Sequence, residues 1–278
     1  MPSYETPEPI TAILEFDVGD VRVRASERPD TVVTVVPSNS GEEADVRAAQ
    51  QTKVSYAHGT LTLKGPKQRS LFGKHGSIDV TVELPAGSHL RSTSPMADHV
   101  CEGTLGECRI KTSFGSIRVD ETDVAHLRTE HGDIHLGRAR GETEIAGSGR
   151  VHVTEIVGGA TVKNNNGETT IGSITGDLKA NNSNGHITVG VAHGSVEART
   201  ANGSVRLHDV ARGVIQIQTA AGDLEVGIRE TSAAWLDVHS KAGGVRNTLS
   251  ASDGPGGAKE TVEIHARTSV GTVIVRRA

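Results

Sequence analysis

A glycine that returns every 17 to 19 residues is the feature that most restricts the fold of this chain. Two and four residues after each glycine stands a pair of apolar residues, such as Ile187 and Val189 after Gly185, with Thr169 as a polar exception. Internal repeats of this length are typical of stacked, repetitive architectures. Seven such marker glycines lie between residues 110 and 226: Gly115, Gly132, Gly149, Gly167, Gly185, Gly203 and Gly222.

Each repeat contains two runs in which apolar and polar residues alternate, and this alternation predicts strands with one buried face. A second glycine, eight or nine residues ahead of most marker glycines, predicts the opposite bend. Repeats of about 18 residues are too short for a four-stranded blade or a helix pair. The sequence therefore predicts an all-β fold, a parallel β-helix or β-solenoid with coils of 17–19 residues and two short strands per coil.

Two polar columns accompany the glycines. Small polar residues recur three positions before them, and we expect these side chains to form hydrogen bonds between coils, because a buried polar group without a partner costs about 1–3 kcal/mol. This column consists of Thr112, Thr129, Ala146, Asn164, Asn182, Thr200 and Thr219. A second ladder is predicted one position before the glycine, at Asn166, Asn184 and Asn202.

The period is regular only in part of the chain, which predicts five segments. Residues 1–9 hold three prolines and are expected to form a flexible arm. Residues 10–100 are expected to be irregular β coils that cap the solenoid, with a short helix near 41–51. Residues 101–247 form the regular solenoid, 248–260 a flexible loop, and 261–278 the last coil or C-terminal cap.

Composition narrows the function classes. The net charge of −5 gives no general reason to expect nucleic-acid binding. No cationic, apolar leader and no apolar run of 18 residues is visible, which predicts a cytoplasmic protein without membrane insertion. The two cysteines, Cys101 and Cys108, do not form a disulfide framework. No nucleophile, phosphate-loop or metal-ligand motif is present, so we assign no catalytic, cofactor-binding or metal-binding residue.

Two surfaces are candidates for partner binding. Basic residues recur four positions before several marker glycines, and we expect this basic stripe to face solvent and to suit an anionic partner. Its members are Lys111, Arg128, Lys163 and Arg199. The other candidate is the loop 65–76, where basic residues surround two apolar ones and a protein partner could dock: Lys67, Arg69, Leu71 and Phe72.

The repeated pattern Thr-x-x-Gly-x-Φ-x-Φ, where Φ is apolar, resembles the bacterial "putative adhesin" or β-strand-repeat family of unknown function. The resemblance covers most of the chain and implies a β-helical fold without catalytic residues. A looser similarity is to bactofilins, which are cytoplasmic β-helices that polymerise end to end. The pattern is seen in Thr112–Val119, Thr129–Leu136, Thr200–Leu207 and Thr219–Val226.

Three functions follow as expectations. The first is a non-enzymatic cytoplasmic scaffold or protein-interaction module, built on a rigid β-solenoid, that binds a protein partner or associates with itself. The second is an adhesin-like binding protein of the surface or envelope. The third is a carbohydrate-active β-helix enzyme, which would need several titratable groups converging in a groove.

Overall fold

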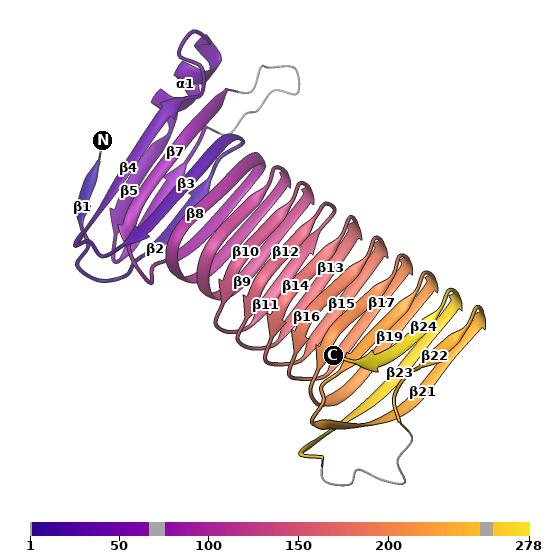
Figure 1. The fold of residues 1–278 in the computed structure, drawn as a ribbon. Coiled ribbons are helices and arrows are strands. Elements are labelled where there is room, and N and C mark those ends of the chain that lie inside the picture. The colour runs from indigo at the N-terminus through magenta and orange to yellow at the C-terminus, as the bar shows by residue number, and fades with distance from the viewer. Residues whose placement is uncertain (1, 67–75, 251–257) are drawn as a thin grey trace. The chain divides into compact units, whose positions relative to one another are not determined.

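The computed structural model describes residues 2–66, 76–250 and 258–278 of the 278-residue chain. The described residues form an all-β fold with one α-helix, as the glycine repeat predicts (Figure 1). They divide into two compact units, residues 1–138 and 139–278. Strands that follow one another at the repeat distance pair in parallel, which confirms the β-solenoid.

Unit 1 contains the helix and the irregular strands. Its elements are β1 (Ser3–Glu5), β2 (Thr11–Glu15), β3 (Val18–Ser26), β4 (Asp30–Pro37), α1 (Glu43–Gln51), β5 (Lys53–Ala57), β6 (Thr60–Lys64), β7 (Ser77–Pro85), β8 (His89–Phe114), β9 (Ile117–His131) and β10 (Ile134–Ala139). The long β8 pairs in parallel with β2 and β3 in its first part, and with β9 from His99 onward.

Antiparallel strands close one end of unit 1. β6 and β7 continue the parallel sheets of β2 and β3, and β5 and β4 then pair with them in the antiparallel direction. The rings of Tyr4 and Tyr56, from the outer strands β1 and β5, lie 5.3 Å apart. Asp45 ties α1 to the sheet by accepting hydrogen bonds from the backbone N–H groups of Asn39 and Ser77, at 3.1 and 2.8 Å.

The first nine residues differ from the predicted flexible arm. Ser3–Glu5 form β1, which pairs antiparallel with β4, and the hydroxyl groups of the buried Thr6 and Thr31 lie 2.8 Å apart. The prolines at positions 2, 7 and 9 do not prevent this, because proline is tolerated at and beyond the ends of an edge strand.

Unit 2 is built from two parallel sheets. The odd-strand sheet has the spatial order β11 (Thr143–Gly147), β13 (Ala160–Asn166), β15 (Leu178–Asn184), β17 (Val196–Asn202), β19 (Gly213–Ala221), β23 (Glu260–Val270), β21 (Ser232–Ala242). The even-strand sheet has the order β12 (Val151–Ile156), β14 (Thr169–Ile174), β16 (Ile187–Ala192), β18 (Val205–Val210), β20 (Leu224–Ile228), β24 (Val273–Arg277), β22 (Val245–Asn247).

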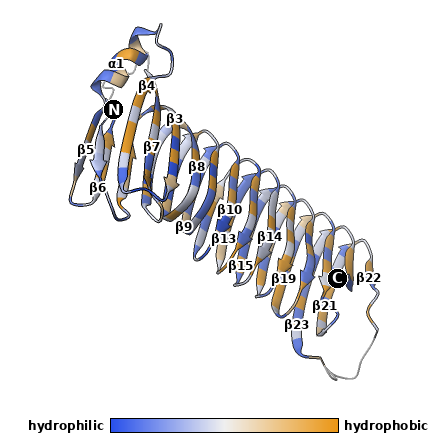
Figure 2. Ribbon diagram, turned by 60° about the vertical axis from the view of Figure 1, so that its left-hand side comes forward, coloured by the Kyte–Doolittle hydropathy of each residue, from blue (hydrophilic) through white to orange (hydrophobic). Residues whose placement is uncertain are grey.

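The core of unit 2 lies between its two sheets. Alternate residues of each strand point inward and are almost inaccessible to solvent, for example Val189 and Ala198 at 0% exposure. Figure 2 shows the alternation as hydrophobic and hydrophilic segments along β13, β15 and β19. Each buried aliphatic side chain contributes roughly 1.5–3 kcal/mol, so this thin core needs few aromatic residues.

The polar column before the marker glycines has a defined partner. Thr200 and Thr219 donate hydrogen bonds to the carbonyl oxygens of Gly185 and Gly203, at 3.1 and 2.8 Å. In each case the acceptor is the marker glycine of the preceding coil. The threonine of the Thr-x-x-Gly pattern therefore forms a hydrogen bond between two successive coils at this corner. The predicted asparagine ladder is confirmed as well, since Asn202 donates to Asn184 at 2.9 Å and Asn184 donates to Asn166 at 3.1 Å.

The prediction that residues 261–278 form the last coil is wrong. β23 and β24 lie between the coil of β19 and β20 and the coil of β21 and β22, so the earlier segment is outermost. Side-chain chemistry explains the order. Asn247 aligns with the fully buried Val275 and is itself exposed, and a buried asparagine there would have to find hydrogen-bond partners among aliphatic side chains.

A row of three aspartates crosses unit 1, because Asp20 on β3 aligns with Asp79 on β7 and Asp98 on β8. Partial burial, followed by the two neighbouring carboxylates, raises the pKa of Asp20. We expect the Asp20→Asn variant to be more stable at pH 7 by about 0.5 kcal/mol, because like charges opposite each other destabilise a sheet.

This gain has a definite pH dependence. A raised pKa means that only the charged carboxyl is penalised, so the advantage of Asp20→Asn should vanish as acid protonates Asp20 in the wild type. Urea denaturation at pH 7 and at pH 4 measures it, with Glu8→Gln as a control of equal charge change at an exposed site. An equal gain in the control would contradict the explanation.

Candidate functional site

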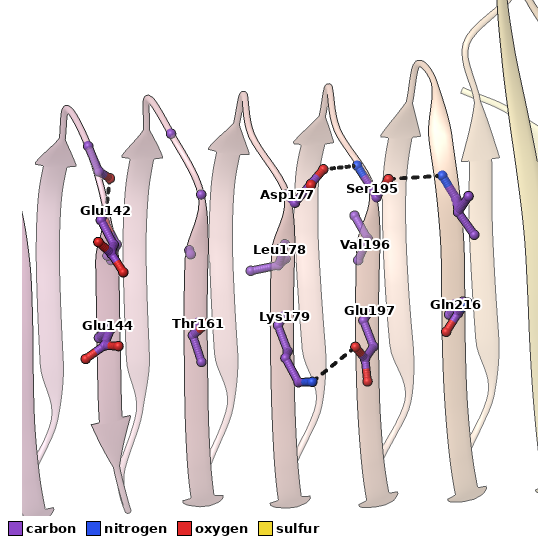
Figure 3. Close-up of a pocket in the computed structure, with 16 residues that line it drawn as sticks. Glu142, Glu144, Thr161, Asp177, Leu178, Lys179, Ser195, Val196, Glu197 and Gln216 are labelled. Carbon is purple, nitrogen blue, oxygen red and sulfur yellow. Dashed lines mark hydrogen bonds and ion pairs between the residues drawn. The ribbon is translucent and has the colours of Figure 1, made fainter.

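The outward face of the odd-strand sheet carries a continuous row of polar side chains. The strand register aligns Glu144, Thr161, Lys179, Glu197 and Gln216, one from each of five neighbouring strands. Figure 3 shows these side chains side by side on successive strands. With strands about 4.8 Å apart, the row from Glu144 to Gln216 extends about 19 Å.

A hollow of about 640 Å³ lies along this row, toward the corners where the strands begin. Glycines create it, because Gly141, Gly158 and Gly159 line the hollow without contributing a side chain. The larger side chains beside it therefore form a rim around exposed backbone. From the sequence, these glycines are predicted only to be turn residues. That they open a hollow on the surface can be inferred only when the strand register is known.

The hollow is acidic. Its lining holds four carboxylates and one ammonium group, namely Glu142, Glu144, Asp177, Glu197 and Lys179. The Lys179 ammonium lies 3.3 Å from the Glu197 carboxylate, and Asp177 accepts a hydrogen bond from the backbone N–H of Ser195 at 2.9 Å. These carboxylates lie close enough together to attract a cationic group on a partner.

The basic stripe predicted from the sequence is partly formed in each unit. In unit 1, Lys111 lies directly opposite Arg128. In unit 2, Lys163 and Arg199 stand two strands apart, with Asn181 between them. The stripe is also partly neutralised, since Arg199 lies 3.1 Å from Glu197 and Arg128 lies 3.9 Å from Glu130. Its binding role stays a prediction.

The second predicted surface lies outside the described residues. Lys67, Arg69, Leu71 and Phe72 all fall within residues 67–75, so the docking role of that loop also stays a prediction.

The two cysteines are buried as free thiols in the core of unit 1. A hydrogen bond to Cys108, together with burial, raises the pKa of the Cys101 thiol well above its usual range. The Cys101 thiol therefore stays protonated at neutral pH, and thiolate is the reactive form of cysteine. Among the described residues, no group of three His, Cys, Asp or Glu side chains is placed to hold a metal ion.

A larger hollow of about 1490 Å³ lies beside β21, with Trp235 and Arg212 in its wall. Ser250 and Ala258 also line it, and they flank residues 251–257, which lie outside the described part of the chain. The acidic hollow is instead an open depression with a lining of described residues. We therefore take the acidic hollow and its polar row as the candidate site.

The chain was compared with known protein families, curated proteins and solved structures. The family model described as Toastrack DUF4097 matches residues 12–254, which is most of the chain. The chain belongs to the Toastrack DUF4097 family. The Toastrack match spans both units and includes every residue of the acidic hollow.

Several solved structures are similar to this Toastrack chain at low identity. A "putative adhesin" from Bacteroides fragilis is 10% identical with a TM-score of 0.37, and the match covers 99% of this chain and 95% of that one. A "putative adhesin" from Parabacteroides distasonis is 12% identical with a TM-score of 0.36, covering 100% and 95%. A "putative cell adhesion protein" from Clostridium sporogenes is 11% identical with a TM-score of 0.26, covering 100% and 98%. No curated protein matches the chain.

None of the described helices is long and apolar enough to cross a membrane.

Proposed function

We propose that this Toastrack chain is a non-enzymatic interaction module that binds a basic segment of a protein partner on the odd-strand sheet of unit 2. The observation that carries the proposal is the acidic hollow beside a polar row of five aligned side chains. A rigid sheet holds these side chains at fixed spacing, so little conformational entropy is lost when a partner binds.

The chemistry of the lining favours a protein segment over a small molecule. Small-molecule sites are lined mainly by hydrophobic and aromatic side chains. The acidic hollow has no aromatic residue in its lining, and of its larger apolar members Leu178 and Val196 are buried in the core, which leaves Val214 as the exposed one. The row of about 19 Å matches roughly six residues of extended chain, which rise about 3.3 Å each.

The charge pattern favours a basic partner over a nucleic acid. Nucleic-acid binding gains most of its affinity from cations that neutralise phosphates. In the basic stripe of unit 2, the Arg199 guanidinium is already paired with the Glu197 carboxylate, and the adjacent row is acidic. A phosphate backbone would therefore meet repulsion from the hollow, whereas lysine or arginine side chains would be attracted to it.

The same contacts support a binding role without catalysis. General acid–base catalysis needs groups that are free to transfer protons to a substrate. In the hollow, the Glu197 carboxylate forms ion pairs with both Lys179 and Arg199. The Asp177 carboxylate accepts a hydrogen bond from a backbone N–H at the corner of the next coil. These polar groups shape the surface, which is the role that an interaction module requires of them.

Selection of displayed random peptides on the full chain tests this function. We expect enrichment of peptides with several Lys or Arg residues, whose affinity falls as salt is raised. The double variant Glu142→Gln, Glu144→Gln should weaken their binding about tenfold, which corresponds to about 1.4 kcal/mol. The control Glu130→Gln, Glu168→Gln removes the same charge at exposed positions outside the hollow and should bind like the wild type. Equal losses in both variants would contradict the proposal.

Cytoplasmic location stays a prediction from the sequence. Fractionation of the producing cells, with protease treatment of intact cells, tests it. A protein that is cleaved on intact cells would instead support the adhesin-like alternative.

A further inference from the structure

The outermost strand of unit 2 leaves one edge uncovered. β21 pairs with β23 on one side, and no described strand pairs with its other side. The inward residues Leu236 and Val238 are only partly buried, whereas Ile264, opposite Leu236 on β23, has 0% exposure. Trp235 is 58% exposed. An uncovered edge strand of this length is a template for pairing with another strand.

The backbone direction of β21 follows from the equivalent positions of the other coils. The N–H of Ala160 on β13 donates to the carbonyl oxygen of Asp177, and the N–H of Leu178 on β15 donates to that of Ser195, both at 2.9 Å. In the register of the sheet, Leu178 is equivalent to Leu236 and Ser195 to Trp235. The backbone of Trp235 therefore faces β23, and the even-numbered residues from Leu236 to Ser240 turn their N–H and C=O groups toward the uncovered edge.

We propose that β21 of a second copy of this chain pairs antiparallel with this edge, about a two-fold axis that passes through Val238. A two-fold axis at residue 238 places even-numbered residues opposite even-numbered residues, so that the free backbone groups of Val238 bond to those of its own copy and those of Leu236 bond to those of the copy's Ser240. The axis runs perpendicular to the sheets, so it also brings β22 toward the same strand of the second copy. Both sheets then continue across the interface, and the half-covered layer with Leu236 and Val238 becomes core.

The side chains of β21 are complementary to themselves in this register. Asp237 lies opposite the partner's His239, and Trp235 lies opposite the partner's Lys241. A carboxylate facing an imidazole and an ammonium group facing an aromatic ring are both favourable pairs across an antiparallel sheet. The symmetry produces both pairs twice. Asp237 is held in place for this contact by the Arg267 guanidinium at 2.9 Å.

Neighbouring registers are poorer. An axis through Asp237 would place two carboxylates directly opposite each other, which destabilises a sheet. An axis through His239 would place two imidazoles opposite each other and leave Trp235 against a glycine, Gly243. The register centred on Val238 is the one that pairs an aromatic ring with a cation and an acid with a histidine.

This inference does not rest on the proposed function, because the acidic hollow is lined by β11 to β19 and the flanking corners. The test is light scattering after size exclusion across a range of concentrations. We expect the full chain to approach twice its mass of 29.1 kDa as concentration rises. Val238→Lys should raise the dimer dissociation constant at least about tenfold, because it places two ammonium groups together at the axis. Val36→Lys, the same change at an exposed valine in unit 1, should leave it unchanged.

Cysteine cross-linking tests the register itself. In an antiparallel sheet, the Cα atoms of a hydrogen-bonded pair such as Val238 and its copy are about 5.5 Å apart, within reach of a disulfide. Oxidation should therefore link two copies of the Val238→Cys variant. Leu236→Cys should stay unlinked, because its two copies would stand about 13 Å apart. A protein that is monomeric at every concentration, or equal cross-linking of both variants, would overturn the inference.

Discussion

Replacing Gly185 by alanine is expected to destabilise unit 2 by about 3–5 kcal/mol, the largest effect of any single change considered for this chain. Gly185 has a φ of +131°, a conformation that L residues with a side chain rarely adopt. A Cβ there would lie 2.0 Å from the carbonyl oxygen of Gly167, which belongs to the backbone of the preceding coil. The new methyl group has no flexible neighbour to displace, so the two coils must separate.

A glycine in the same unit provides the control. Gly244 has no neighbouring atom within 4 Å of the position of a Cβ, and its φ lies outside the positive range. We expect Gly244→Ala to change the free energy of unfolding by less than about 0.5 kcal/mol. Urea denaturation of both variants measures the difference. A Gly185→Ala protein as stable as Gly244→Ala would contradict the close stacking of the corners.

Acid is expected to destabilise unit 1 through one buried histidine. His99 is 1% exposed on β8, and its Nε2 lies 2.8 Å from the hydroxyl of Ser92. Its Nδ1 lies 3.2 Å from the carbonyl oxygen of Ala97, which can only accept, so Nδ1 carries the proton of the neutral ring. Burial lowers the pKa of His99 to about 4.

The sign of the effect follows from this pKa. The unfolded chain takes up a proton on His99 below about pH 6.5, while the folded chain does so only near pH 4. The stabilising effect is therefore complete above pH 6.5 and is lost as the pH falls to 4. The loss is about 2 kcal/mol at pH 5 and about 3 kcal/mol in total.

Urea denaturation between pH 7 and pH 5 checks this prediction. We expect His99→Gln to be less stable than the wild type at pH 7 and to show a weaker decline on acidification. His208→Gln, at an exposed histidine of β18, should keep the decline of the wild type. A decline in His99→Gln as steep as that of the wild type would show that other groups cause the acid sensitivity.

Much of the fold could be predicted from the sequence because the solenoid repeats its local chemistry. The marker glycines and the apolar pairs after them specify a corner and a strand in every coil. Polar residues at fixed distances before the glycine, such as Thr200 and Asn202, form hydrogen bonds to the preceding coil. Because every repeat has the same local pattern, each strand pairs with the equivalent strand of the adjacent repeat. This pairing can therefore be predicted without knowing contacts between residues far apart in the sequence.

The order of the last two coils could not be predicted in the same way. The segments around Gly243 and Gly271 both carry the repeat, so local pattern does not tell which one lies outermost. The decision depends on the long-range alignment of Asn247 with Val275. The same limit applies to β1, since its pairing with β4 depends on residues 25 or more positions away.

The candidate site was only partly predictable. The spacing correctly aligned Lys111 with Arg128 and placed Lys163 in one row with Arg199. It did not reveal that Glu197 would pair with Arg199, or that Gly158 and Gly159 would open an acidic hollow beside them. The ion pair joins two side chains of the same strand, β17, whereas the hollow arises between strands 17 to 19 residues apart and requires the register of the whole sheet.

Site-specific photo-cross-linking in the producing cells is the most direct test of the claim that this chain binds a protein through the odd-strand sheet of unit 2. Thr161 on β13 and Thr170 on β14 are partly buried threonines that point outward from the two different sheets. A photoreactive residue at Thr161 should yield a protein adduct that disappears in the Glu142→Gln, Glu144→Gln background, and one at Thr170 should yield none. Equal adducts at both positions, or no adduct at Thr161, would contradict the proposed function.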